Sequence, residues 1–464
     1  MKNLKSYTIG IDLGTSGVKV AILDLKTFKL INYASISYNN SSKQDSDMLW
    51  KATIEVLGES LKGFSNKGNI KAIGLTGQMH GTVLYDKQNK VIGPIINWQD
   101  DSCNRPLKNY SGQTTADLIN EKLQNINIDD LGVDRIASGF LGATLFYIRV
   151  NDKELFESIE KAVLPVDFIR AKLLGKTDYS TDQTNACSTG LFNTRENNWH
   201  YQVIDTLELP HDILPEVHNT YEIAGNISKN ISEYLGIDRK IKIIFGGGDN
   251  QISLIGSGLI SSKSPVLVNI GTGAQISKIT DKYSKIPGID TRSFINSQYA
   301  YVGASLGGGE KYKWLSDKEG LSFKELDNLA RNVKNRADGL KFSTGPTRLN
   351  PGRNFGFYGN DKNVRSTAHR ARAVMEGVVE DLIDFYSLIG SYESDYLIGS
   401  GNALIKSEVW SQITADMFGK PLMLAAHEST VFGAAVMAAY GIGGIEKIDD
   451  ALSQISYREI KPGK

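Results

Sequence analysis

Apolar residues near the start of the chain follow the pattern of short strands. Three stretches rich in Ile, Val and Tyr are separated by tight connections, at residues 7–12, 18–25 and 29–38. Such β-branched and aromatic runs bounded by turn residues are typical of strands. The pattern predicts an antiparallel meander.

Helical and strand patterns then alternate. Apolar residues recur near helical spacing over residues 46–63, and an apolar strand pattern follows at residues 70–76. A meander followed by helix and strand crossovers predicts an α/β domain with a mixed sheet.

A second start of the same kind appears downstream. Apolar strands are predicted at 241–245 and 266–270, and the latter leads into a Gly-Thr-Gly turn like that after the first strand of the chain. The repetition predicts two related domains, at 1–240 and 241–464. We expect the second domain to contain a helix over 367–389, a strand over 396–398 and a final helix over 431–440.

Composition narrows the class of protein. The chain has 464 residues, enough for two or three domains, with 41% hydrophobic and 22% charged residues. Lys and Arg number 52 and Asp and Glu number 52, so no net field attracts nucleic acid or an acidic membrane. Small molecules or other proteins are the expected partners.

Location follows from cysteines and apolar segments. Cys103 and Cys187 lie in unrelated contexts, which predicts reduced thiols and a cytoplasmic protein. The apolar stretch after residues 1–5 is interrupted by Asp12, so no secretion signal is evident. The uncharged segment between Glu428 and Glu446 contains four glycines and is shorter than the ~20 apolar residues that span a bilayer.

The turn after the first strand has the residues of a phosphate loop. Gly14 and Gly17 can adopt positive φ and turn backbone N–H groups toward an anion, and the hydroxyls of Thr15 and Ser16 add donors. Asp12 could hold Mg²⁺ and Lys19 could add positive charge. A plain glycine-rich hairpin is the alternative. A second such turn at Gly271, Thr272 and Gly273 favours a nucleotide held by two loops.

Other nucleotide signatures are missing. The run Gly175-Lys176-Thr177 would need a glycine at Arg170 to be a phosphate-binding P-loop, so we expect a helix end followed by a turn. The Gly-x-Gly runs at 256–258 and 399–401 lack a third glycine, which argues against a dinucleotide site.

Asp249 follows three glycines at the end of an apolar strand. A carboxylate in this position suits a general base for phosphoryl transfer to an alcohol. The alternative is a helix N-cap, because an apolar run follows at 252–255.

Further polar residues favour a polyol ligand. Gln78 and His80 lie between two glycines and offer paired donors and acceptors, whereas no histidine has zinc-site spacing. Trp98 and Asp100 could contact a sugar or anchor a loop. The turn at 399–403 could admit a purine or only join a strand to a helix.

Together these motifs resemble the FGGY carbohydrate kinases of the actin-like ATPase superfamily. The resemblance spans nearly the whole chain and rests on motifs that occur in family order: residues 12–16, 77–81, 98–100, 181–186 with 190–192, 246–250, 271–273 and 399–403. It implies an α/β chain of two ribonuclease-H-like domains with an interdomain cleft, and ATP with Mg²⁺. A homodimer is expected from the same resemblance.

The resemblance also implies roles for single residues. Asp249 would be the general base and Asp12 the carboxylate at the metal or phosphate site. The phosphate-loop hydroxyls would be Thr15, Ser16 and Thr272; the sugar contacts Met79, His80, Asp100 and Asn250; and the adenosine contacts Gly401 and Asn402.

Within the family the motifs are most similar to those of sedoheptulokinases. Xylulokinases, however, share Gly-Gln-Met-His-Gly and Gly-Gly-Gly-Asp-Asn. Related kinases usually carry Arg two residues after the aspartate of the Trp-x-Asp motif. This chain has Ser102 there and Arg105 three positions later, so either Arg105 takes that place or the sugar differs.

The expected activity is phosphorylation of the terminal primary hydroxyl of a ketose. Sedoheptulose is the first candidate, and D-xylulose or another sugar of this family is the alternative. A function of a different class, a nucleotide-gated sugar sensor without turnover, would use the same fold.

Overall fold

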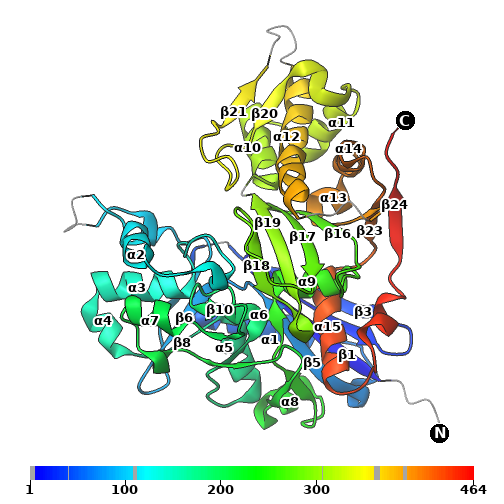
Figure 1. The fold of residues 1–464 in the computed structure, drawn as a ribbon. Coiled ribbons are helices and arrows are strands. Elements are labelled where there is room, and N and C mark those ends of the chain that lie inside the picture. The colour runs from blue at the N-terminus through cyan, green and yellow to red at the C-terminus, as the bar shows by residue number, and fades with distance from the viewer. Residues whose placement is uncertain are drawn as a thin grey trace. The chain divides into compact units, whose positions relative to one another are not determined.

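The computed structural model describes residues 6–39, 41–107, 112–305, 307–359, 366–389 and 394–463. The chain forms two compact units (Figure 1). Unit 1 comprises Met1–Ile260, Arg292–Tyr299 and His427–Gln454; unit 2 comprises Ser261–Thr291, Ala300–Ala426 and Ile455–Lys464. Residues 1–5, used above in the argument about secretion, lie outside the described residues.

The main sheet of unit 1 has seven strands in the order β13-β14-β5-β1-β2-β3, with β15 also beside β5. Its strands are β1 (Tyr7–Gly14), β2 (Gly17–Asp24), β3 (Lys29–Ser37), β5 (Ile70–Gly77), β13 (Ile223–Asn226), β14 (Lys242–Ile244) and β15 (Gly247–Gly248). Strands β1, β2 and β3 form the predicted antiparallel meander, and β5 pairs with β1 in parallel. The predicted meander and crossover are therefore confirmed.

A second sheet in unit 1 has the order β4-β7-β6-β8 and carries part of the candidate site. Its strands are β4 (Lys43–Gln44), β6 (Gly81–Asp86), β7 (Val91–Asn97) and β8 (Ile159–Val163). Two small pairs are β9 (Ser180–Asp182) with β12 (Glu216–His218), and β10 (Phe192–Asn193) with β11 (Asn198–Trp199).

Unit 1 also contains α-helices. They are α1 (Ser46–Ser60), α2 (Thr115–Leu123), α3 (Leu141–Asn151), α4 (Lys153–Ser158), α5 (Pro165–Leu174), α6 (Gln183–Ala186), α7 (Tyr201–Thr206), α8 (Lys229–Leu235), α9 (Asp249–Gly256), α15 (Ser429–Gly441) and α16 (Ile448–Leu452). Helix α5 ends at Leu174, and Gly175 follows with φ 65°, so the Gly-Lys-Thr run is the helix end that the sequence predicted.

Unit 2 repeats the strand order of unit 1. Its main sheet runs β18-β19-β17-β16-β22-β23-β24, in which β16 pairs antiparallel with β17 and parallel with β22. The strands are β16 (Val266–Ile270), β17 (Ala274–Thr280), β18 (Asp290–Ser293), β19 (Tyr299–Ser305), β22 (Leu397–Ser400), β23 (Leu422–Ala425) and β24 (Tyr457–Ile460). The predicted pair of related α/β domains is confirmed.

The other strands and α-helices that the structure describes in unit 2 lie outside this sheet. They are β20 (Lys341–Ser343), β21 (Gly356–Tyr358), α10 (Gly309–Glu319), α11 (Phe323–Arg331), α12 (Thr367–Leu388), α13 (Asn402–Lys406) and α14 (Glu408–Phe418). Buried residues of α12 form a core cluster with the central strands, among them Val374, Val378 and Phe385.

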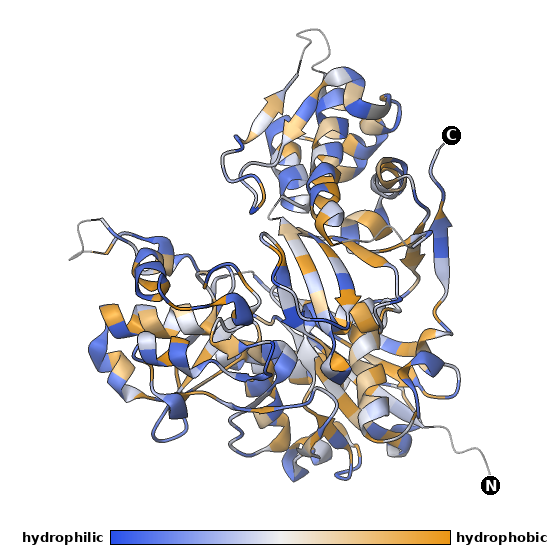
Figure 2. Ribbon diagram, viewed as in Figure 1, coloured by the Kyte–Doolittle hydropathy of each residue, from blue (hydrophilic) through white to orange (hydrophobic). Residues whose placement is uncertain are grey.

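Helix α15 lies in unit 1, although the sequence-based division at residue 240 placed it in the second domain. It is apolar almost all round (Figure 2), and it is buried from Val431 to Ala439, as expected for a helix enclosed by its neighbours. Two glycines of the sheet allow this contact. A Cβ atom on Gly10 would lie 2.0 Å from the carbonyl oxygen of Val431, and one on Gly74 would lie 2.0 Å from that of Ala434.

Neither cysteine forms a disulfide, and both are buried. Among the residues that the structure describes, no helix combines the length and the apolar character that crossing a bilayer requires.

Candidate active site

Asp12 and Lys19 face each other across the first hairpin. Asp12 lies within β1 and is directly opposite Lys19 of β2, so both side chains are on one face of the sheet. The Lys19 Nζ atom is 3.5 Å from Asp12 Oδ2 and 2.8 Å from Glu428 Oε1. The Thr430 hydroxyl donates to Asp12 Oδ2 at 2.7 Å.

The charges of this group are strongly coupled. Asp12 is 5% exposed, and its burial raises the pKa of its carboxyl although Lys19 acts in the opposite direction. Burial alone would lower the pKa of Lys19, but the carboxylates of Asp12 and Glu428 raise it above its ordinary value. Lys19 therefore stays a cation beside the Asp12 carboxyl.

The turn after β1 is a tight hairpin. Gly14 and Gly17 pair with each other in the ladder, and neither has positive φ, so the predicted left-handed glycines are wrong. Gly17 is required for close packing instead, because its Cβ would lie 2.4 Å from the carbonyl oxygen of Ile36. Thr15 Oγ1 accepts from the Trp98 indole at 2.9 Å, and Ser16 is exposed.

The segment after β5 is fixed by a buried serine. The Ser188 hydroxyl donates to the carbonyl oxygen of Met79, and His80 Nδ1 is 2.9 Å from the carbonyl oxygen of Ser188. Since a carbonyl only accepts, Nδ1 carries the proton. The His80 ring stacks on Phe140 at 4.3 Å. Gln78 is 1% exposed and donates to Gln44 Oε1, so its amide is held inside the domain.

Asp249 is the first residue of α9. The N-cap is Gly248, so the alternative that Asp249 itself caps the helix is wrong. The backbone N–H of Asn250 donates to Asp249 Oδ1 at 2.8 Å. Asp249 keeps part of its surface open to solvent. Burial and the nearby charge of Asp12 nevertheless raise its pKa to about 6, against the effects of Asn250 N–H and Arg292.

Arg292 is a site residue that the sequence did not reveal. Its side chain is 7% exposed, its Nη1 donates to Met79 Sδ at 3.3 Å, and its charge acts on Asp249. The next residue, Ser293, accepts at its carbonyl oxygen from Gln251 Nε2 at 3.2 Å. A lone arginine near the end of β18 belongs to no motif, so only the structure brings it to this site.

Asp100 is tied to its own loop. Its carboxylate accepts from the backbone N–H and the hydroxyl of Ser102, at 3.0 Å and 3.1 Å, and it is 7% exposed. The Arg105 side chain is 67% exposed and pairs with Asp101. Arg105 therefore does not occupy the place of the arginine that Ser102 replaces. Asn250, in turn, is half-buried in the first turn of α9.

The second Gly-Thr-Gly turn contributes to a cavity within unit 2. The N–H groups of Gly309 and Glu310 donate to the carbonyl oxygens of Gly271 and Thr272, so the turn lies at the start of α10. The cavity of about 690 Å³ is lined by Gly271, Thr272, Gly309, Glu310, Tyr312, Lys313, Phe323, Lys324, Asp327, Asn402, Ala403, Lys406, Ser407 and Trp410. Its size and its aromatic walls suit a flat small molecule.

Gly401 shapes one end of this region. It has φ 88°, and a Cβ there would lie 2.4 Å from the carbonyl oxygen of Ile270. The expected turn from strand to helix is thus present, between β22 and α13. Gly401 and Gly273 are not among the residues that line the cavity.

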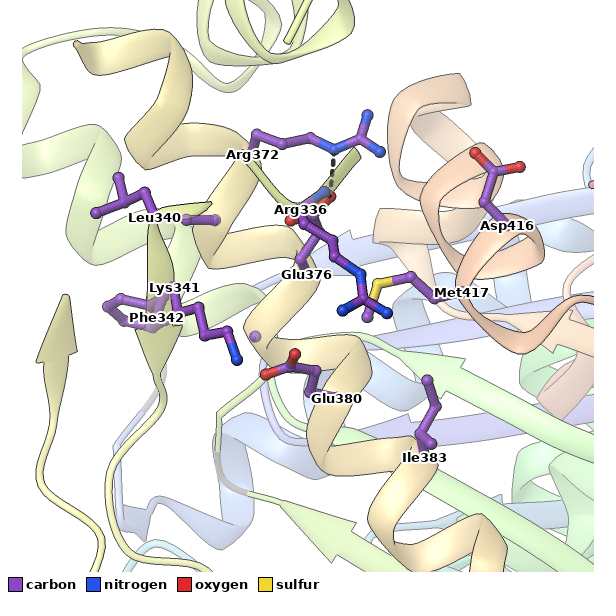
Figure 3. A pocket seen from close by; sticks show the side chains of 12 residues that line it. Arg336, Leu340, Lys341, Phe342, Arg372, Glu376, Glu380, Ile383, Asp416 and Met417 are labelled. Atoms are coloured by element: carbon purple, nitrogen blue, oxygen red, sulfur yellow. Dashed lines mark hydrogen bonds and ion pairs between the residues drawn. The ribbon is translucent and has the colours of Figure 1, made fainter. Parts of the chain in front are cut away.

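Another cavity of unit 2 has balanced charge (Figure 3). It measures about 430 Å³ and lies among α12, β20 and α14. Arg372 Nε donates to Glu376 Oε1 at 2.7 Å, and Arg336 and Glu380 also line it. None of the residues predicted for the active site contributes to its wall.

The surroundings of Asp12 fit a magnesium ion that binds together with substrate phosphate. Within the described part of the chain, no three His, Cys, Asp or Glu side chains gather as a metal site. Mg²⁺ is usually held by one or two carboxylates together with substrate phosphates and water. A single buried carboxylate is consistent with that kind of binding.

Comparison with known proteins gives the family. Residues 7–256 match the N-terminal domain and residues 280–442 the C-terminal domain of the FGGY family of carbohydrate kinases. Xylulose kinase of Staphylococcus epidermidis (strain ATCC 12228) is 27% identical over 97% of this chain and 90% of its own. Xylulose kinase of Bacillus subtilis is 27% identical over 97% of this chain and 91% of its own.

A solved structure shows the same fold. Gluconate kinase from Lactobacillus acidophilus superposes with a TM-score of 0.87 at 21% identity, covering 99% of this chain and 94% of that one. Because the two family domains match most of the chain, it belongs to the FGGY family of carbohydrate kinases.

Proposed function

We propose that the chain transfers the γ-phosphoryl group of ATP to the terminal primary hydroxyl of a linear ketose, with D-xylulose as the first candidate. The observation that best supports the reaction is the environment of Asp249, because the charges of Asp12 and Arg292 both act on its carboxyl, whose pKa is about 6. The xylulose kinases to which the chain is similar along most of its length support the choice of sugar.

Asp249 acts as the general base in this proposal. With a pKa of about 6, roughly nine tenths of the Asp249 carboxyl is ionised at pH 7. The carboxylate accepts the hydroxyl proton of the sugar as the sugar oxygen forms its bond to phosphorus and the bond to ADP breaks. A base with a pKa just below the working pH combines ionisation with useful basicity.

The acceptor sugar is held by groups around Asp249. Met79, His80 and Asn250 keep their proposed contacts, and the position of Arg292 adds a buried guanidinium with several donors. Asp100 and Gln78 already have hydrogen-bond partners within the protein. We therefore propose that these two residues shape the sugar site.

The nucleotide has proposed contacts in each unit. In unit 1, Asp12 would hold Mg²⁺, and Lys19 with the 14–16 turn would contact phosphate oxygens. Held there by Asp12, Mg²⁺ would supply positive charge to offset the negative charge of the transferred phosphoryl group. In unit 2, the cavity lined by Gly271, Thr272 and Asn402 would take the adenosine, with Gly273 and Gly401 shaping the adjoining turns.

Sedoheptulose is the second candidate. The motif resemblance to sedoheptulokinases supports it, whereas the relatives described above carry the name xylulose kinase. The structure bears on the question through Ser102. Its hydroxyl binds Asp100 and Arg105 pairs elsewhere, so a sugar hydroxyl normally held by an arginine there would need another partner.

The test is sugar-dependent release of ADP with Mg²⁺ and ATP. D-xylulose, sedoheptulose, D-ribulose, gluconate and glycerol are compared at equal concentrations, and kcat/KM is measured for each. We expect D-xylulose to give the highest value. A higher kcat/KM for sedoheptulose would reverse the order of the candidates. Binding of sugars without ADP release above background, in folded protein, would contradict the kinase proposal and favour a sensor.

A further inference from the structure

The segment at residues 180–189 has been described so far only through Ser188, which contacts Met79 and His80. It contains β9 and α6 and is buried from Thr181 to Thr189. Asp182 is 0% exposed, so its carboxylate cannot touch a substrate. A buried carboxylate persists only where hydrogen bonds compensate its lost solvation, and its partners reveal what it holds in place.

Nearby polar groups of unit 1 hold the Asp182 carboxylate. Oδ1 accepts from the backbone N–H of Thr184 at 2.8 Å, from the Thr184 hydroxyl and from the Thr220 hydroxyl at 3.2 Å. Oδ2 accepts from Asn185 Nδ2 at 2.6 Å. Because the Thr184 hydroxyl gives its one proton to this carboxylate, its remaining capacity is that of an acceptor.

The hydroxyl oxygen of Thr184 accepts a hydrogen bond from the residue that precedes the proposed base. The backbone N–H of Gly248 donates to Thr184 Oγ1 at 2.9 Å. Gly248 is the N-cap of α9, and Asp249 follows it. Gln251, which lies two residues after Asp249 in α9, donates from Nε2 to the carbonyl oxygen of Thr184 at 3.3 Å. Two hydrogen bonds thus join Thr184 to the turn that carries Asp249.

The other end of the segment holds the proposed sugar contacts. The Ser188 hydroxyl lies 2.6 Å from the carbonyl oxygen of Asn185 and also contacts that of Met79. The carbonyl oxygen of Ser188 accepts from His80. One short buried segment therefore contacts both the turn that carries Asp249 and two proposed sugar-binding residues, at the backbone of Met79 and the side chain of His80.

We infer that Asp182 and Thr184 are positioning residues, which fix the Gly248 backbone through the relay Asp182–Thr184–Gly248 and so aim Asp249 at the acceptor hydroxyl. The inference rests on the proposed role of Asp249 as the base. Thr184 is the residue on which the relay depends, since it forms hydrogen bonds with both Asp182 and Gly248.

The expected effect of breaking the relay is on turnover. Replacing Thr184 by Val keeps the shape of the side chain but removes the hydroxyl, so the Gly248 N–H loses its acceptor. A misplacement of reacting groups by about 1 Å costs on the order of 10²-fold in rate. We expect kcat of Thr184→Val to fall by about 10- to 100-fold, and KM for sugar and for ATP to change far less.

The experiment compares Thr184→Val, Thr184→Ser and Thr53→Val in the full chain. Thr53 is a matched control, because it is also 0% exposed, and its hydroxyl donates only within α1, to the carbonyl oxygen of Leu49. The measurements are kcat and KM with D-xylulose, and amide hydrogen exchange in the peptide that contains Gly248. Thr184→Ser, which keeps the hydroxyl, should restore both kcat and the protection of this peptide.

The outcomes separate this inference from the proposed function. The relay is supported if Thr184→Val shows faster exchange at Gly248 and a reduced kcat. Thr184→Ser should return both quantities to the parent values, and Thr53→Val should change neither. A kcat equal to that of Thr53→Val, or unchanged exchange, overturns it. If the parent chain phosphorylates no sugar, the proposed function fails, and exchange still decides whether Thr184 holds Gly248. If Thr184→Val does not fold, Thr184→Cys, with its weak hydrogen-bonding thiol, is judged by the same criteria.

Discussion

The charge of Arg292 should determine the pH range in which the protein is active. Asp249 must be ionised to accept a proton, and its pKa of about 6 is the balance of opposing causes. Burial and the charge of Asp12 raise that pKa, whereas Arg292 lowers it. Replacing Arg292 by Met removes a positive charge that favours the carboxylate, so the pKa of Asp249 must rise.

The size of the pH effect follows from the ionised fraction. Below the pKa, kcat/KM should fall about tenfold for each pH unit, and at pH 5 only about one eleventh of Asp249 is ionised in the parent chain. In Arg292→Met this loss should begin at higher pH, so that activity at pH 6 falls more than activity at pH 8. Arg292→Lys, which keeps the charge, should retain most of the parent profile.

The assay is kcat/KM for D-xylulose between pH 5 and pH 8 with saturating ATP and Mg²⁺. ATP ionises in the same way whichever variant is assayed. A shift of the pH profile between variants therefore reflects a change in the protein. An Arg292→Met profile with an unchanged midpoint, or with a midpoint at lower pH, would refute the electrostatic coupling of Arg292 and Asp249.

Further predictions concern packing and buried charge. Gly10→Ala should destabilise unit 1 by about 1–3 kcal/mol, because its Cβ would overlap the backbone of α15, whereas Gly58→Ala, with 3.9 Å to its nearest contact, should be neutral or stabilising. Thermal unfolding of the two variants checks this, and an equal midpoint would contradict it. Arg170→Met should cost about 3–5 kcal/mol, because it leaves the buried Asp167 without its ion pair. Arg105→Met should leave both the unfolding midpoint and kcat unchanged, since Arg105 is exposed and its ion pair with Asp101 lies at the surface; a lower kcat would return it to the sugar site.

Local sequence patterns predicted the elements well. The meander of β1 to β3, the strand β16 and the helix α12 were all predicted within a few residues, because each has apolar residues at one clear period. The division of the chain was harder to predict. Residues His427–Gln454 return to unit 1, and close contacts such as those of Gly10 and Gly74 with α15 show why they do so.

The candidate site was predicted in part. The motifs identified Asp12 and Asp249, and in the structure the charge of Asp12 helps to raise the pKa of Asp249. They did not identify Arg292, which is brought to Met79 by tertiary structure alone. The motif at 181–186 was recognised as a family feature, but its connection to Gly248 depends on a hydrogen bond between residues 64 positions apart.

The most direct test of the account is turnover by Asp249→Asn, with sugar binding measured on the same protein. The variant keeps the shape of the side chain and removes the base. The account predicts that kcat with D-xylulose falls by about 10²- to 10⁴-fold, while calorimetry still detects binding of the sugar. Turnover close to that of the parent chain would contradict the assignment of Asp249 as the general base.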